Sequence, residues 1–210
     1  MLIKKMIGIF THKKYLIKMF SLLRKHINSR VPLTDEEFNI CTKFFISKKL
    51  KKHQFLLNEG DVCRYLGFVN SGCLREYTID NRGTEHIIQF AIEDWWISDP
   101  YSFISGLPAI YNIDALQDSD VLLLEKSARD KLLDACPKME RFFRLLIEAN
   151  HVASHQRISD SLSASAEERY LKFIKTYPKL FEQVPQNHIA SYLGITPQSL
   201  SRIRKELSQK

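Results

Sequence analysis

The spacing of apolar residues changes near residue 127, and this change restricts the folds open to the chain. Before it, short apolar runs alternate with turn residues, at positions 55–57, 66–69, 73–79, 84–90, 110–116 and 121–124. Strands at this spacing are typical of a sandwich or jelly-roll barrel. After it, apolar residues recur every three or four positions, as in amphipathic helices. We therefore expect an α+β protein, with an N-terminal antiparallel β-roll followed by helices.

The clearest expected hairpin joins residues 73–79 to residues 84–90. Its connection, Asp80-Asn81-Arg82-Gly83, contains Asn and Gly, which tolerate the positive φ of a tight turn. In the second strand, an alternation predicts one apolar face made of His86, Ile88 and Phe90.

Three helix starts carry a hydroxyl followed three residues later by an acid, the pattern of a capping box. These pairs are Thr34 with Glu37, Ser127 with Asp130, and Ser165 with Glu168. The first helix is expected to place on its apolar side Phe38, Cys41, Phe44 and Phe45.

A long helix is expected over residues 137–162, with Pro137 at its first position. Residues spaced by three and four form a seam along it: Met139, Phe142, Leu146, Ala149 and Ala153. The seam is either a contact within the chain's own core or a parallel dimeric coiled coil. We favour the dimer, because a helix of this length between two small domains has little partner surface in its own chain.

The last 25 residues carry the strongest chemical signal. Two helices are expected around a three-residue turn, with Gly194 as the left-handed cap, Thr196 as the next N-cap and Pro197 at the first helical position. Ala190, then Gly194, then Leu200 follow the spacing of a helix-turn-helix. An ordinary helical hairpin in a core is the alternative.

The second helix of this pair presents polar side chains opposite Leu200, Ile203 and Leu207. Arg bonds guanine bidentately, Gln bonds adenine, Ser adapts to either, and Lys neutralises phosphate. We therefore predict DNA contacts from six residues: Thr196, Gln198, Ser199, Ser201, Arg202 and Lys205.

The formal net charge of +7 is concentrated at the two ends of the chain. Residues 1–18 contain five lysines and no acid, residues 185–210 carry a net +3, and the body between them is nearly neutral at −1. The basic C-terminal end agrees with a nucleic-acid partner. We treat residues 1–18 as a disordered basic extension, because their apolar stretch is too short for a signal peptide.

The sequence resembles the Crp/Fnr family of bacterial transcription regulators, in its Bacteroidetes-type members. The resemblance is carried by Ile189 to Pro197 with Leu200 to Arg204, and by Asn58-Glu59-Gly60-Asp61 followed by Gly67-Phe68-Val69-Asn70-Ser71-Gly72. It covers most of residues 19–210. In the family, the position that matches Arg202 is a base-reading arginine.

The resemblance implies a dimeric DNA-binding regulator in the cytoplasm. Residues 19–136 would form a cyclic-nucleotide-binding-like sensor domain, residues 137–163 a dimerisation helix, and residues 164–210 the helix-turn-helix domain. The implied partners are a near-palindromic operator in double-stranded DNA, a second copy of the chain and RNA polymerase. We expect no membrane partner, because no apolar run reaches the length needed to cross a bilayer.

The effector is not expected to be cyclic AMP. Family members that bind it carry a Gly-Glu pair for the ribose and an Arg-Ser pair for the phosphate, and the matching positions here hold Ser98-Asp99 and Ala109-Ile110. Nothing at the second pair neutralises a phosphate. The loop offers a different candidate ligand site, lined by Trp96, Asp99, Tyr101, Phe103 and Tyr111, although core packing is the favoured role of its aromatic residues.

Enzymatic and metal-binding interpretations have weaker support. The alternative function is a cupin-like small-molecule or enzymatic β-barrel with a helical oligomerisation tail, which would need paired histidines on one strand. We find no ligating spacing among the histidines His53, His86, His151, His155 and His188, and predict no cofactor, no metal and no catalytic residue. The four cysteines, Cys41, Cys63, Cys73 and Cys136, lack the close spacing of an iron-sulfur site and are expected to be buried thiols.

Overall fold

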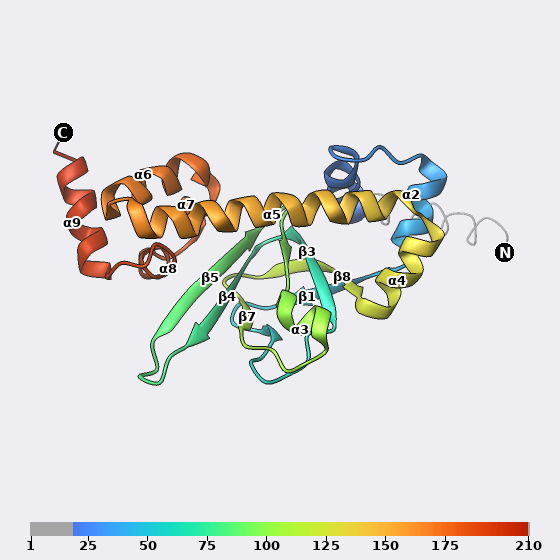
Figure 1. The fold of residues 1–210 in the computed structure, drawn as a ribbon, viewed down its shortest axis with the longest axis horizontal. Coiled ribbons are helices and arrows are strands. Elements are labelled where there is room, and N and C mark those ends of the chain that lie inside the picture. The colour runs from blue at the N-terminus through green and yellow to red at the C-terminus, as the bar shows by residue number, and fades with distance from the viewer. Residues whose placement is uncertain (1–18, 210) are drawn as a thin grey trace, which may run out of the picture.

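A computed structural model describes residues 19–209 as a β-roll, a long helix beside it and a group of short helices at one end (Figure 1). The expected basic extension, residues 1–18, lies outside the described residues. Residues 19–28 are helical and precede helix α2 (Asp35–Thr42). The capping box of α2 is confirmed, because Thr34 Oγ1 accepts from the Glu37 N–H at 3.2 Å while Glu37 accepts from the Thr34 N–H at 2.8 Å.

The first helix is shorter than expected, because it does not include Phe44 and Phe45. Helix α2 ends at Thr42, and Phe45 begins strand β1 (Phe45–Leu50), which pairs along its whole length with strand β8 (Ser119–Glu125). The ladder hydrogen bonds to β8 outweigh the local helical pattern, as tertiary context commonly does. Phe45 still faces the helices from its strand, because its side chain is buried in the same cluster as Phe38.

Two four-stranded antiparallel sheets form the roll. The first has the order β1-β8-β3-β6, with β3 (Tyr65–Ser71) and β6 (Trp96–Ile97), and the second has the order β2-β7-β4-β5, with β2 (Phe55–Leu57), β7 (Asn112–Ala115), β4 (Cys73–Ile79) and β5 (Glu85–Ile92). Helix α3 (Pro100–Ser105) lies in the connection between β6 and β7.

Side-chain alternation along the strands makes each sheet two-faced. On β8, Val121 and Leu123 belong to the cluster inside the roll, whereas Leu122 and Leu124 belong to the cluster under the N-terminal helices. Successive strand residues point to opposite faces, so one continuous apolar run serves two cores.

The β4–β5 hairpin has the expected turn, with Gly83 at φ +79°. The predicted apolar face of β5 is wrong. The pairing register shifts between Glu76 and Tyr77, which leaves an extra residue in β5, so Ile87 and Phe90 pack on the same side while His86 is exposed. A bulge of this kind interrupts the two-residue period.

Helix α4 (Lys126–Ala135) also departs from expectation at its start. Its N-cap is Glu125, without a side-chain hydrogen bond, and Ser127 lies inside the helix. The chain enters α4 directly from β8, whose last residue is Glu125, so the helix starts earlier than its capping motif.

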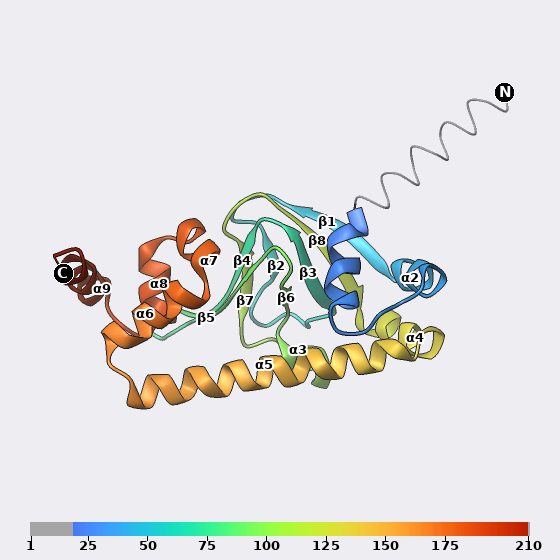
Figure 2. The ribbon, with the colours of Figure 1, turned by 90° about the horizontal axis from the view of Figure 1, so that it is seen from above.

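Helix α5 (Lys138–Ser163) runs along the side of the roll, with Pro137 as its N-cap (Figure 2). Only the first part of the expected seam is covered by its own chain: Met139 and Phe142 are fully buried against the N-terminal helices, and Leu146 is half-buried. The core contact, the alternative to the predicted dimer contact, therefore holds for these three residues. Ala149 and Ala153 of the seam are exposed, and for them the dimer contact stays a prediction. On the opposite face, large apolar side chains are exposed: Ile147, Ile158 and Leu162 at 65%, 54% and 84%.

The C-terminal helices are α6 (Ala166–Thr176), α7 (Pro178–Gln183), α8 (Gln186–Tyr192) and α9 (Pro197–Leu207). The expected capping box of α6 is confirmed, since Ser165 and Glu168 bond each other's backbone N–H at 3.2 and 2.8 Å. These helices share one apolar cluster with the outer side of β4 and β5, including Cys73, Tyr77, Ile87 and Phe90. Figure 2 shows α8 beside β5.

Among residues 19–209, no helix is long and apolar enough to cross a membrane.

Candidate nucleic-acid interface

Helices α8 and α9 form the expected helix-turn-helix. Helix α8 ends at Tyr192, Gly194 adopts φ +67°, and the Ile195 N–H donates to the Ala190 carbonyl at 3.0 Å. Ala190 is fully buried where a larger side chain would separate the helices. Glycine suits this turn because an L side chain is strained at positive φ.

The start of α9 is fixed by its own sequence. Thr196 Oγ1 accepts from the Ser199 N–H at 3.1 Å, and Pro197 occupies the first turn, where a missing N–H has no cost. Leu200 and Ile203 are buried in the cluster shared with Tyr170 and Phe173 of α6. Burial of two such side chains contributes roughly 1.5 to 3 kcal/mol each, which holds the helix in one orientation.

The face of α9 opposite this core is polar and open. Gln198, Ser201, Arg202 and Lys205 are exposed, whereas Ser199 is half-buried and lies 2.9 Å from the Thr196 hydroxyl. The Arg202 side chain is 75% exposed, with its Nε 3.9 Å from Glu206 Oε1. Exposed pairs of this kind contribute little to stability, so the guanidinium can turn toward a bound base.

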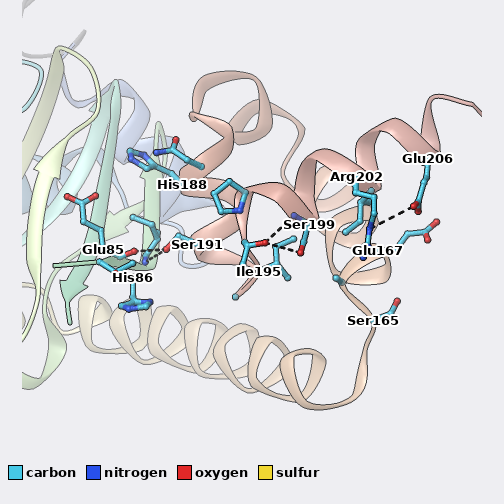
Figure 3. Close-up of a pocket in the computed structure, with 18 residues that line it drawn as sticks. Glu85, His86, Ser165, Glu167, His188, Ser191, Ile195, Ser199, Arg202 and Glu206 are labelled. Atoms are coloured by element: carbon cyan, nitrogen blue, oxygen red, sulfur yellow. Dashed lines mark hydrogen bonds and ion pairs between the residues drawn. The ribbon is translucent and has the colours of Figure 1, made fainter. Parts of the chain in front are cut away.

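A groove of about 1050 Å³ separates α9 from the β4–β5 hairpin (Figure 3). Glu85 and His86 line the hairpin side, and Ser199, Arg202 and Glu206 line the α9 side. Gln198, Ser201 and Lys205 are not among its lining residues. The groove walls carry the carboxylates of Glu85 and Glu206, so the side of α9 away from the hairpin is the more favourable one for a polyanion. Arg202 lies at the border between the groove and that exposed side.

The first helix of the pair is bonded to the roll. Ser191 Oγ accepts from the Ile87 N–H at 3.0 Å and donates to the Glu85 carbonyl at 3.0 Å. These bonds use backbone groups of β5, which is an edge strand. They cap the otherwise unpaired edge of the sheet at this point.

A buried charge cluster lies next to this contact. Arg75 on β4 donates from Nε to Asp114 Oδ1 at 2.8 Å and also bonds Glu85, while its Nη1 donates to His188 Nε2 of α8 at 3.1 Å. Burial lowers the pKa of Arg75, but the Asp114 and Glu85 carboxylates outweigh it and raise that pKa. Burial, followed by the nearby Arg75 charge, lowers the pKa of His188.

Helix α5 is tied to the same region through Arg157. Its guanidinium donates to the Ile88 carbonyl at 2.6 Å and lies 4.9 Å from the ring centroid of Tyr192 on α8. Sequence reasoning missed Arg157, Arg75, His188 and Ser191. The available signal was a charged residue, Arg75, in the middle of an expected strand.

The five residues predicted to line a ligand pocket do not form one cluster. Trp96 is buried under the N-terminal helices and donates to His26 Nε2 at 3.3 Å, whereas Phe103 is buried inside the roll. Tyr101 is exposed on α3, and Tyr111 is half-buried, with a pKa raised by burial and by the Glu76 charge.

Asp99 is fully buried and serves as a local cap. Its Oδ1 accepts from the Ser102 N–H at 2.9 Å and its Oδ2 from the Ile110 N–H at 3.0 Å. The neighbouring backbone is also used, because the Ala109 N–H donates to the Asp61 carbonyl at 2.7 Å. The N–H groups that an anion could have met at Ala109 and Ile110 are therefore already bonded.

Glu76 on β4 points into the roll, on the opposite side of the strand from Arg75. It is 2% exposed, and its Oε1 has no hydrogen-bond partner among the described residues. Burial, with a smaller contribution from Asp99, raises the pKa of Glu76 to about 8. The side chain is therefore mostly a neutral acid at pH 7.

All four cysteines are free and buried. Burial raises the pKa of Cys41 and of Cys73 to about 12, so both remain thiols at neutral pH. They occupy core positions in three different apolar clusters.

Residues 47–136 match the family described as the cyclic nucleotide-binding domain. The chain is 28% identical over 169 residues to the fumarate and nitrate reduction regulatory protein of Vibrio cholerae, a match that covers 74% of this chain and 66% of that relative. The matched part is thus just under two thirds of the relative's length.

Solved structures share the fold at low sequence identity. FixK2 from Bradyrhizobium japonicum superposes with a TM-score of 0.67 at 18% identity, over 79% of this chain and 85% of that one. A transcriptional regulator described under the Crp/Fnr family, from Eubacterium rectale, superposes with a TM-score of 0.63 at 17% identity, over 84% of each chain. These matches cover 79% and 84% of this chain, so the likeness in fold extends beyond the β-roll.

Proposed function

We propose that the chain is a DNA-binding transcription regulator of the Crp/Fnr type, which acts as a homodimer and reads a near-palindromic operator through α9. In this proposal the roll is the sensor domain, α5 is the dimerisation helix, and residues 164–210 form the DNA-binding domain. The relatives are regulators, so the alternative of an enzymatic or small-molecule-binding β-barrel is not favoured.

The observation that carries the proposal is the exposed polar face of α9 on a helix fixed by its own core. Arg202 and Gln198 project from the first two turns, where a recognition helix meets base edges. We assign base contacts to them and a phosphate contact to Lys205. Thr196, Ser199 and Ser201 complete the proposed interface at the start of the helix.

The dimer is proposed to form through the exposed face of α5. Ile147, Ile158 and Leu162 lie there on one stripe, turned away from the roll. Both α5 helices must run in the same direction, because α9 lies beyond the C-terminal end of α5 and two copies of α9 must reach one stretch of DNA (Figure 1). The two-fold axis of such a dimer matches a palindromic site.

We further propose that the effector is not cyclic AMP. Asp99 and the Asn58–Asp61 turn already bond the N–H groups of Ile110 and Ala109. A cyclic phosphate placed there would lie next to the buried Asp99 carboxylate, and bringing the two negative charges together inside the roll costs several kcal/mol.

Selection of bound fragments from random duplexes tests the main proposal. The expected product is a symmetric motif whose half-sites are centred about 10 base pairs apart, roughly 34 to 36 Å. Recovery of a single asymmetric half-site, bound by one chain, would contradict it.

A further inference from the structure

Two histidines stand side by side on the exposed face of α5. His151 and His155 are one helical turn apart, and their ring centroids are 4.3 Å apart. Both side chains are exposed. Sequence reasoning found no ligating spacing among the histidines, yet a four-residue separation on a helix places two imidazoles on one face, as in helical zinc motifs.

The same face carries the stripe proposed to bind a second copy. Ile147 lies one turn before His151, and Ile158 lies about one turn after His155, both exposed. Arg157 points the other way, into its bond with the Ile88 carbonyl. The histidine pair therefore interrupts an apolar contact surface near its middle.

We propose that His151 and His155, together with the same two residues of a second copy, form a binding site for Zn²⁺ or a similar borderline transition metal. The inference rests on the proposed dimer. With parallel α5 helices, residues near the two-fold axis meet their own counterparts, so two imidazoles from each chain converge at one level.

The chemistry of the donors suits this metal class. Four neutral imidazoles give the nitrogen set that Zn²⁺ accepts at about 2.0 to 2.1 Å in a tetrahedron, in which neighbouring nitrogens lie about 3.4 Å apart. The ring centroids of His151 and His155 are 4.3 Å apart, which allows one nitrogen of each ring to reach this nitrogen–nitrogen distance. No carboxylate is needed, and Glu148, three residues before His151, is paired with Arg144 at 2.7 Å. Within residues 19–209 of one chain, no group of three such ligands exists, so one copy supplies only half of the site.

Metal titration of the full chain, stripped with a chelator, tests the site. We expect Zn²⁺ to bind at one ion per two chains and to tighten dimerisation at least tenfold, and Co²⁺ to give the intense visible absorption of a tetrahedral complex. His151→Ala and His155→Ala should each weaken binding at least 100-fold. His53→Asn, at an exposed histidine on the roll, is the matched control and should bind like the parent.

Sedimentation of the metal-free protein separates this inference from the proposed dimer. A metal-free monomer that associates with one Zn²⁺ per two chains would contradict the constitutive dimer and support the site. Binding of one ion per chain, an octahedral Co²⁺ spectrum, or equal binding by the parent and His155→Ala would overturn the site whatever the oligomeric state.

Discussion

The hydroxyl of Ser191 accepts a hydrogen bond from the backbone N–H of Ile87 at 3.0 Å, which bonds the helix-turn-helix to the edge strand of the roll. This contact crosses 104 residues of sequence. It makes the position of α8 depend on the conformation of β5.

Replacement of Ser191 by alanine should loosen this contact. The Ile87 N–H would lose its partner, at a cost of about 1 to 3 kcal/mol, so its amide hydrogen exchange should accelerate by tenfold or more. Ser161→Ala, which removes an exposed hydroxyl on α5, is the control and should leave that exchange rate unchanged. An unchanged rate in Ser191→Ala would show that the bond does not hold the two halves together.

Arg202→Ala and Lys205→Ala should have different effects on DNA binding. Loss of a bidentate base contact at Arg202 should cost about 1 to 3 kcal/mol and relax base preference at one position per half-site. Lys205→Ala should weaken all sequences alike and reduce the salt slope by about one. Competition binding against matched and random duplexes, with Arg141→Ala as a distant control, measures both. Equal weakening of both duplexes by Arg202→Ala would refute its role in base reading.

A charge on the exposed stripe of α5 should separate the dimer. Ile158→Glu would bury a carboxylate in the proposed contact and should weaken dimerisation more than tenfold. Val152 is also exposed, at 67%, but lies off the stripe, so Val152→Glu should sediment like the parent. The same loss in both variants, or in neither, would place the dimer contact elsewhere.

Cyclic AMP and cyclic GMP should produce no binding heat in calorimetric titration at micromolar concentrations. The reason is the Asp99 carboxylate, which occupies the Ser102 and Ile110 N–H groups inside the roll. Micromolar binding of either nucleotide, accompanied by tighter operator binding, would be the contrary result.

Glu76 should make the protein less stable as pH rises. Its pKa is about 8 in the folded chain, above the unfolded value near 4.5, so the folded state binds the extra proton between these values. The contribution of protonated Glu76 to the free energy of unfolding is complete below about pH 4.5. It decreases as pH rises and is lost above about pH 8.

Glu76→Gln keeps the shape of the side chain and removes the charge. The variant should therefore be more stable than the parent at pH 8, by about 3 to 5 kcal/mol, and similar to it at pH 4.5. Denaturant unfolding at both pH values measures the difference. If the difference in unfolding free energy between Glu76→Gln and the parent did not change with pH, the pKa of Glu76 would not be raised in the folded chain.

Local signals were enough to predict the helix-turn-helix. The structural effects of Gly194, Thr196 and Pro197 depend only on residues close to them in sequence. The structure has the expected turn at Gly194 and the expected N-cap at Thr196. The same holds for the hairpin turn at Gly83 and the capping boxes at Thr34 and Ser165.

Contacts between residues far apart in sequence determine the features that local patterns could not predict. Phe45 fits a helix by its spacing, but pairing with Leu124 makes it a strand residue. The α5 seam has a helical period, but the period does not tell whether its partner is the same chain or another. The contact of Trp96 with His26, 70 residues away, likewise has no local signal.

On strand β4, Glu76 points into the roll and Arg75 points outward to α8. The hairpin at residues 73–92 is therefore part of the packing of both the roll and the C-terminal helices. This has a consequence for the exchange of parts between related regulators. A hybrid joined at α5 would pair a foreign α8 with the native Arg75, Asp114 and Glu85, and would leave a buried guanidinium cluster facing an unmatched helix. A functional graft would have to carry the outer face of this hairpin along with the reading helices, although more than 70 residues separate them in the chain.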